Sequence, residues 1–523
     1  MPLVCYALTY HHMKTRSLIL SLLITAACAN AQVPEEALRL SWLNQMGTAR
    51  NQAIGGAMGS LGGDATASLV NPAGLAFFKT SDFVISPTLQ MGKMKTNFRG
   101  TEREDPNLQK FAWGTSGFVF GGQGYRGKNS YSISFTQKAS FNRSFRYNGN
   151  NNYSSFGEPL GDEFAASRLT IDQALNSPDI SLTTKMALYT YLVDTAMVNG
   201  IPQVIVRSEN SSMLHQEYSA EMKGGITEIT LGFGHESNKK WMIGGSIGIP
   251  IVMVDRNSYF RESDATSALN DFSFLSYREK YRLSGVGVNL RAGAIYRPKE
   301  YIRLGLAIHT PDMFTLKETF ESGFAADLEN LFAPNSGYDS VSSTTVNNGI
   351  IPVARFNVNT PARMILSGSY VFREVANVKK QRAFVTADIE YLNYKWSNFS
   401  DPKENTSDTR AYYKPFNDAI KASYKGAFNF RLGAEVKFNI VMARLGFASY
   451  GSPYKDAELR SNKTFLSGGL GYRDKGIFLD LTYTYRMNRD VHFPYRVSAP
   501  RANTYAGLKD NGGQLMLSLG FKI

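Results

Sequence analysis

Alternation of apolar with polar or small residues recurs along most of this chain, and it limits the fold more than any other feature. Every second residue is apolar or aromatic from Ile477 to Tyr485, from Ile302 to Ile308 and from Leu515 to Ile523. Successive side chains of a β-strand point to opposite faces, so this period predicts strands with one apolar face. We therefore expect an all-β fold.

The character of these segments favours a membrane barrel over a soluble sandwich, which also produces alternation. Many segments have ten residues or more, and most carry small or polar residues on one face. That face suits a wet or plugged lumen, and the opposite face suits lipid. The last segment also has an aromatic residue, Phe521, near its end, as outer-membrane assembly signals do. We predict a transmembrane antiparallel β-barrel in the outer membrane of a Gram-negative bacterium, inserted by the barrel assembly machinery.

The segments number about fourteen, an even count of the kind that single-chain bacterial barrels have. They are predicted near 83–98, 111–123, 129–145, 216–236, 240–254, 277–297, 301–316, 358–372, 382–397, 427–438, 440–449, 464–473, 476–487 and 512–523. Short connections alternate with long ones, which fall near 99–110, 146–215, 255–276, 317–357, 398–426, 450–463 and 488–511. Short turns on one side and long loops on the other are typical of such barrels. We expect the barrel to occupy 83–523, with its long loops, above all 146–215, 317–357 and 398–426, outside the cell.

The N-terminus predicts a signal peptide over 1–31. A basic start from Met13 to Arg16 precedes the apolar stretch Leu18–Ala29, which ends in a small-x-small cleavage pattern. We interpret Met13 as the true start. Lipoprotein processing at Cys28 is the alternative, which Thr25 weakens because a Leu-like residue normally stands there.

Cleavage after residue 31 would remove both cysteines, Cys5 and Cys28, and leave four well-separated histidines. The mature chain would then have no disulfide and no thiolate metal site. The histidine spacing suggests no metal or cofactor, and we predict none.

Residues 32–82 carry no strand pattern and are rich in Gly and Ala. A segment of small residues can pack tightly inside a lumen, so we predict a hatch or plug; a disordered leader is the alternative. In the 146–215 loop, Ser181–Met197 predicts an amphipathic helix and Glu163–Leu175 a second one. The apolar face of the Ser181–Met197 helix either packs within the loop or forms a surface for an apolar ligand. The residues of that face are Met186, Tyr189, Leu192 and Val193, with Ala196 beside them.

The net charge of +13 is spread along the chain without a Lys/Arg block, so we expect no nucleic acid partner. The charge fits better with an anionic membrane surface, formed by outer membrane lipid or lipopolysaccharide, as the partner.

Enzyme signals are weak. Gly244–Gly248 matches G-x-S-x-G, but a strand follows it where a nucleophile elbow needs a helix. Gly122–Lys128 resembles a P-loop, but Asn129 replaces the Ser/Thr.

Several motifs resemble those of FadL/TodX-type outer membrane transporters, in the form common in Bacteroidetes-like bacteria. They are Asn71–Leu75, Ala294–Pro298 before Arg303–Ala307, Asn359–Arg363, and Leu432–Glu435 through Gly451–Tyr454. The resemblance implies a fourteen-stranded barrel with an N-terminal hatch. It also implies uptake of long-chain fatty acids or other hydrophobic molecules, which leave laterally through the barrel wall. By the same resemblance, Asn71, Pro72 and Ala73 lie near that opening and are the candidate gate residues.

Three functional classes follow. The first is a hydrophobic-compound transporter, which is not an enzyme. The second is a non-transporting barrel of a secretion or assembly system, as in the PorV-like branch. The third is a haem receptor, for which His215 or loop tyrosines would supply the axial ligand.

Overall fold

A computed structural model describes residues 33–122, 128–266, 268–332, 337–372, 382–459, 461–498 and 501–523. The predicted signal peptide lies outside these residues. The fold is a closed antiparallel β-barrel of fourteen spans, as predicted from the alternation. Closure comes from the first span pairing with the last: β1 (Asp82–Ile85) and β2 (Pro87–Phe98) both pair with β23 (Ala506–Lys522).

Five spans are divided by a short break and nine are continuous. The divided spans are β1 and β2; β3 (Thr101–Trp113) and β4 (Ser116–Gly121); β5 (Lys128–Ser140) and β6 (Arg143–Asn151); β12 (Ile302–His309) and β13 (Met313–Asp327); and β15 (Val353–Asn359) and β16 (Arg363–Phe372). The continuous spans are β9 (Leu214–Asn238), β10 (Trp241–Asp264), β11 (Phe274–Lys299), β17 (Ala383–Asn393), β19 (Gly426–Phe438), β20 (Val441–Tyr450), β21 (Asn462–Asp474), β22 (Ile477–His492) and β23.

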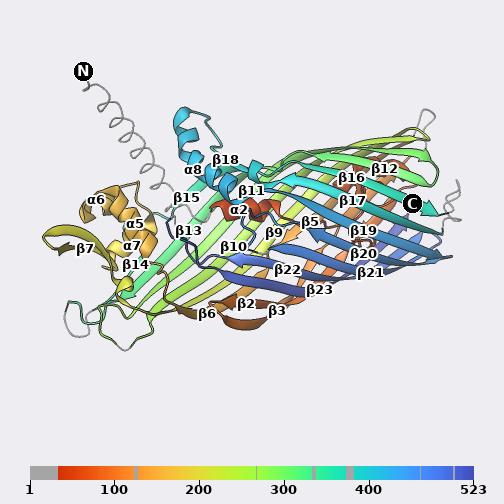
Figure 1. Ribbon diagram of the computed structural model, residues 1–523. Coiled ribbons are helices and arrows are strands. Elements are labelled where there is room, and N and C mark those ends of the chain that lie inside the picture. The colour runs from red at the N-terminus through yellow and green to blue at the C-terminus, as the bar shows by residue number, and fades with distance from the viewer. Residues whose placement is uncertain are drawn as a thin grey trace, which may run out of the picture.

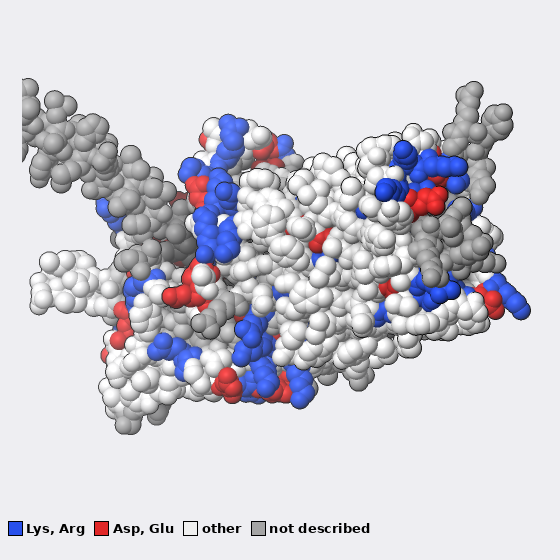
Figure 2. Space-filling view, turned by 45° about the vertical axis from the view of Figure 1, so that its right-hand side comes forward, with Lys and Arg blue, Asp and Glu red and all other residues white. Residues whose placement is uncertain are grey.

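An apolar belt surrounds the barrel and places it in a membrane. Outward-facing Val286, Val288 and Leu290 on β11 are exposed, whereas the residues between them are buried or small. Figure 2 shows a broad band almost free of charge, with Lys, Arg, Asp and Glu gathered toward the two ends. A closed barrel satisfies its backbone internally, so this belt can face lipid. Among the described helices, none combines the length and apolar character needed to cross a membrane.

The loop end of the barrel carries most of the helices outside the lumen (Figure 1, left). One loop contains α5 (Glu158–Ser167), α6 (Ile171–Asn176), α7 (Leu182–Tyr189) and a hairpin of β7 (Val193–Val198) and β8 (Ile201–Val206). Another holds β18 (Asn398–Ser400) and α8 (Ser407–Ser423), and β14 (Tyr338–Ser342) belongs to a third. The C-terminus lies at the opposite, short-turn end (Figure 1). Long loops mark the extracellular side, so the C-terminus is periplasmic.

Several predicted boundaries are wrong, mainly where strands leave the membrane. The expected loop at 99–110 is a tight turn at Arg99 and Gly100, both with positive φ, and β3 follows at once. Likewise, β10, β13 and β15 run into the expected loops 255–276 and 317–357, and β6 into 146–215. Above the lipid the outward strand face meets water, so the outer apolar residues give way to polar ones although the strand continues.

The loop helices also differ from the prediction. The expected helix Ser181–Met197 ends at Tyr189, and its second half forms β7. Val193, Thr195 and Val198 are β-branched, which favours a strand over a helix. The expected helix Glu163–Leu175 is two helices, α5 and α6, separated at Arg168, which has a left-handed φ of 57°.

Candidate functional site

The segment between Val33 and Phe78 lies inside the barrel. It forms α2 (Val33–Ser41), α3 (Ala49–Ala53), α4 (Ala67–Val70) and the 3₁₀-helix η1 (Pro72–Phe77). Almost every residue from 47 to 78 is buried. Wall side chains hold its backbone: Ser518 Oγ accepts from Ala49 N at 2.8 Å, and Ser246 Oγ donates to the Ser68 carbonyl at 2.7 Å. We call residues 47–78 the floor.

The predicted gate residues Asn71, Pro72 and Ala73 belong to this floor and are buried. Asn71 caps η1: its Oδ1 accepts from Ala73 N at 3.1 Å, while its Nδ2 donates to the Gly59 carbonyl at 2.6 Å. The Asn71 side chain fits against the wall only because residue 293 is a glycine. A Cβ on Gly293 would lie 1.9 Å from Asn71 Oδ1. None of these three residues lines the large cavity described below.

Glycines of the wall accommodate the floor on both sides of the barrel. A Cβ on Gly305 would lie 2.2 Å from the Gly59 carbonyl oxygen, and one on Gly446 would lie 2.1 Å from Gly55 N. Asp388, from β17, accepts from the amides of Met58 and Gly59, both at 3.0 Å. The floor thus packs directly against the inner side of the wall.

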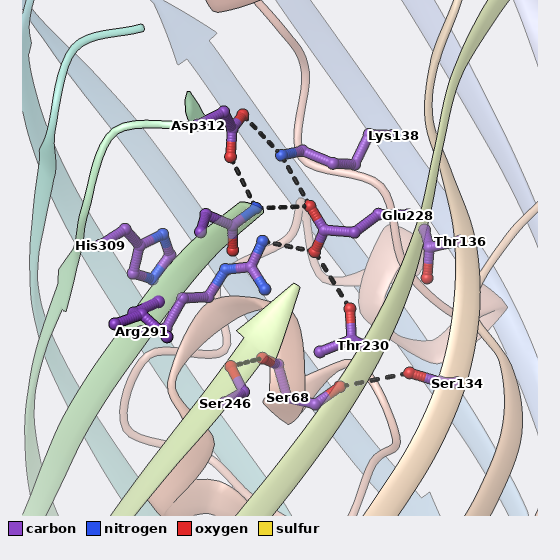
Figure 3. A network of polar contacts seen from close by, with 12 residues as sticks. Ser68, Ser134, Thr136, Lys138, Glu228, Thr230, Ser246, Arg291, His309 and Asp312 are labelled. Carbon is purple, nitrogen blue, oxygen red and sulfur yellow. Dashed lines mark hydrogen bonds and ion pairs between the residues drawn. The ribbon is translucent and has the colours of Figure 1, made fainter. Parts of the chain in front are cut away.

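A buried ionic network next to the floor joins four spans (Figure 3). Glu228 accepts from Arg291 Nη2 at 2.5 Å and lies 2.9 Å from Lys138 Nζ, which also bonds Asp312 at 2.8 Å. Beside it, His309 Nε2 lies 2.9 Å from the Val70 carbonyl of the floor. Lys138 comes from β5, so the network ties that strand to β9, β11 and the break before β13.

A cavity of about 740 Å³ lies on the extracellular side of the floor. The helix α2 and Trp42 line one part of it, and inward side chains of several strands, among them β9, β10, β11 and β22, line other parts. Its apolar and aromatic lining includes Trp42, Phe141, Tyr218, Met222, Phe260, Tyr281, Tyr454 and Phe465. The volume lies within the range of small-molecule sites, and the lining has the mixed apolar and polar character of one.

The cavity reaches a seam in the wall between the second and third spans. The ladder between these spans runs only from Ser116–Gly121 against Ser130–Phe135. Beyond it, within the described residues, β3 pairs with β2 alone and β6 pairs with β9 alone. The lining residues include all of 138–143, which span the end of β5, the break and the start of β6.

The third span bends inward at this seam. Phe141 N donates to the Gly224 carbonyl at 2.9 Å, and Gly224 N donates to Asn142 Oδ1 at 2.9 Å. Gly224 has a φ of +107°, a conformation that glycine favours, so the break is built into β9 as well. After the bend, the Arg146 carbonyl accepts from inward-facing Thr96 of β2 at 2.8 Å. The upper part of β6 therefore lies across the inner face of β2.

Two cations line the cavity with few partners. Lys463 Nζ lies 4.1 Å from the Trp42 ring centroid and donates to the Trp42 carbonyl at 2.5 Å; among the described residues no carboxylate pairs with it. Arg143, the first residue after the bend, is 4.0 Å from Asp490, and its Nε has no partner. Both can donate hydrogen bonds to an anionic group, since a partly buried cation with few partners gains from a carboxylate.

The helix α2 is held over the cavity by ion pairs. Glu36 lies 2.7 Å from Arg39 and 3.5 Å from Arg256 of β10. Glu35 pairs with Arg496 of the last loop. Burial raises the pKa of Glu35, although the guanidinium of Arg496 opposes that shift.

The predicted apolar loop surface is mostly interior. Met186, Leu192 and Val193 are buried in a loop core with Phe156, and of the four predicted residues only Tyr189 is exposed, at 44%. The loop therefore buries most of that face within itself. His215, the expected haem ligand, bonds Asn150 and lies outside the cavity lining, whereas His492 lines it and bonds Tyr147.

The sequence prediction missed Trp42, Arg143, Lys463 and the Lys138 network. Charges at inward positions of apolar strands were the available signal, but similar charges such as Arg444 simply pair with carboxylates on nearby strands of the wall. Gly244–Gly248 is part of β10, as interpreted, and its Ser246 bonds the floor.

Comparison with solved structures finds others with this fold. The crystal structure of the P. putida toluene transporter TodX is 13% identical, with a TM-score of 0.50, and the alignment covers 92% of this chain and 99% of that one. A Pseudomonas aeruginosa FadL homologue gives 13% identity and a TM-score of 0.52, with the same coverage. No protein-family model and no curated protein sequence matches the chain. The class is thus an outer-membrane β-barrel with a lumenal N-terminal segment. Its fold is that of FadL/TodX-type structures.

Proposed function

We propose that this barrel takes up hydrophobic small molecules, with long-chain fatty acids as the finer assignment, and releases them sideways through the wall. The observation that carries the proposal is the cavity of about 740 Å³ whose lining includes residues 138–143 at the seam. A ligand held there has a path to lipid that needs no passage through the floor. The fold shared with TodX and the FadL homologue supports the same conclusion.

The cavity lining favours an amphipathic cargo. Burying an acyl chain against residues such as Met222 and Phe260 stabilises it by roughly 0.8 kcal/mol per methylene. Arg143 and Lys463 offer donors to a carboxylate, which a toluene-like cargo would not use. These two side chains are the reason for preferring a fatty acid over a neutral hydrocarbon.

In this proposal, residues 47–78 act as a fixed hatch. Asn71, Pro72 and Ala73 position it against β10 and β11 and affect the seam only indirectly, through the network around Lys138. Release then requires a change in the part that lines the cavity, α2 and the bend at 141–142, which lowers the affinity of the pocket. A non-transporting secretion component would not need a cavity that reaches the seam.

The test is uptake of labelled oleate by cells lacking the gene, with and without its restoration. We expect restored, saturable uptake that falls strongly in Asn71→Leu, which disrupts the floor, and is unchanged in Asn97→Leu, an exposed strand position. Equal uptake with and without an assembled barrel would remove fatty acids as cargo. Labelled toluene and haem in the same cells would then distinguish the remaining classes.

A further inference from the structure

The outer wall carries a run of basic residues just beyond the lipid belt. On β11, outward positions change from Leu290, Val288 and Val286 through Ser284 to Arg282, Lys280 and Arg278. These three basic side chains are exposed or largely so, and they stand on one face because they are two residues apart. Successive residues of this face are about 6.7 Å apart along the strand.

Strand pairing places further basic residues next to this run, on β13 and β15. Ser284 pairs with Lys317 of β13, and Lys317 pairs with Arg355 of β15, both exposed. Adjacent strands lie about 4.8 Å apart, so Arg282, Lys317 and Arg355 lie along one edge of the belt. We call Arg278, Lys280, Arg282, Lys317 and Arg355 the outer basic face.

Little on the protein neutralises this face. Arg282 pairs with Asp255 at 2.6 Å, and Arg278 lies over the Tyr259 ring, 5.5 Å from its centroid. In the part of the chain that the structure describes, no ion pair joins Arg278, Lys280, Lys317 or Arg355 to a carboxylate. Besides Asp255, one more acid lies next to this face: Glu321 of β13, which is opposite Lys280 in the strand register.

Several outward basic residues elsewhere on the wall are paired. On the β2–β3 hairpin, Lys93 and Lys95 both bond Glu104, at 2.8 and 2.9 Å. On β9, Lys223 bonds Glu221 at 2.9 Å. The outer basic face, by contrast, leaves four of its five cations without a carboxylate partner among the described residues.

We propose that the outer basic face binds the phosphorylated headgroup of a glycolipid of the outer leaflet, of the lipopolysaccharide type. The charges are complementary, and their position at the edge of the belt selects a lipid. Acyl chains can lie on Val286, Val288 and Leu290 while a phosphate contacts Lys280, Lys317 or Arg355. Inorganic phosphate would meet only well-hydrated side chains and gain little from them.

The test uses the purified barrel in detergent and native mass spectrometry with three probes: phosphorylated lipid A, the same lipid after dephosphorylation, and inorganic phosphate. The quadruple variant Arg278→Gln/Lys280→Gln/Lys317→Gln/Arg355→Gln should bind phosphorylated lipid A at least about tenfold more weakly. The control Lys93→Gln/Lys95→Gln should bind it as the parent does. Heat-modifiable migration on gels establishes that each variant is folded.

A charge-preserving variant, Arg278→Lys/Lys280→Arg/Lys317→Arg/Arg355→Lys, should retain binding and guards against an effect of misfolding. The proposal is overturned if the quadruple variant binds like the control, or if the dephosphorylated lipid binds as well as the phosphorylated one. Effective competition by millimolar inorganic phosphate would also overturn it, because the face would then be a simple anion site. The outcome is independent of uptake.

Discussion

Lys138 and Asp312 form an ion pair of 2.8 Å between the bent third span and the break before β13. Lys138 lines both the large cavity and a second one of about 40 Å³ next to the floor. Its position makes it a link between the seam, where we place ligand exit, and the floor, which we consider fixed. The predictions below test this arrangement part by part.

Neutralising Lys138 should loosen the seam. In Lys138→Met, Asp312 loses its cation while Glu228 keeps Arg291, so we expect a loss of about 1–3 kcal/mol of stability. The measurement is the thermal midpoint of barrel unfolding in detergent. The midpoint of Lys138→Arg, which keeps the charge, should fall less than that of Lys138→Met. A midpoint unchanged in Lys138→Met would show that the network does not hold the third span.

Adding one methyl group to the wall should displace the floor. Gly293→Ala places a Cβ 1.9 Å from Asn71 Oδ1, whereas Gly368→Ala meets nothing within 4 Å. Overpacking of this kind typically costs about 1–3 kcal/mol. We expect lower stability and greater entry of large hydrophilic antibiotics for Gly293→Ala only. Equal behaviour of the two variants would mean that the floor adjusts freely.

Removing the two cavity cations should weaken binding of acids selectively. Charged hydrogen bonds contribute about 1.5–3 kcal/mol each, so Arg143→Met/Lys463→Met should bind oleate at least about tenfold more weakly. Methyl oleate, which lacks the charge, should bind both proteins alike. Fluorescence displacement on purified protein measures both affinities. A parallel loss for acid and ester would assign these residues to packing instead.

The loop core should respond to truncation of its buried residues alone. Leu192 is fully buried, so Leu192→Ala should destabilise the loop by about 2–5 kcal/mol and expose it to limited proteolysis. Tyr189→Ala, at an exposed position, should change cleavage little. If Tyr189→Ala lowers oleate affinity while Leu192→Ala does not, the loop surface contributes to ligand capture after all.

The barrel could be predicted from the sequence because lipid imposes an apolar residue at every second position of a span. Ile302–Ile308 and Leu515–Phe521 therefore appear where expected, in β12 and β23. The rule fails at the membrane surface. Arg103 and Glu104 lie in β3 although they read as a loop, because a strand beyond the lipid faces water on its outer side.

The candidate site was only partly accessible to sequence reasoning. Asn71 stood out as part of a short motif, and the structure places it in the floor. The cavity depends on contacts between segments far apart in the chain, such as that of Trp42 with Lys463. A local sequence pattern does not predict such contacts. The bend at Phe141 is equally hidden, since it depends on Gly224 in another strand.

Locking the seam tests the central claim most directly. We would introduce Trp113→Cys/Gln137→Cys, where Trp113 N donates to Gln137 Oε1 at 3.2 Å, and join the thiols with a short reducible cross-linker. The control, Lys93→Cys/Glu104→Cys, joins β2 and β3, which are already paired. Saturable oleate uptake should be lost in the locked seam variant, return on reduction, and persist in the control. Full uptake through a locked seam would contradict lateral release.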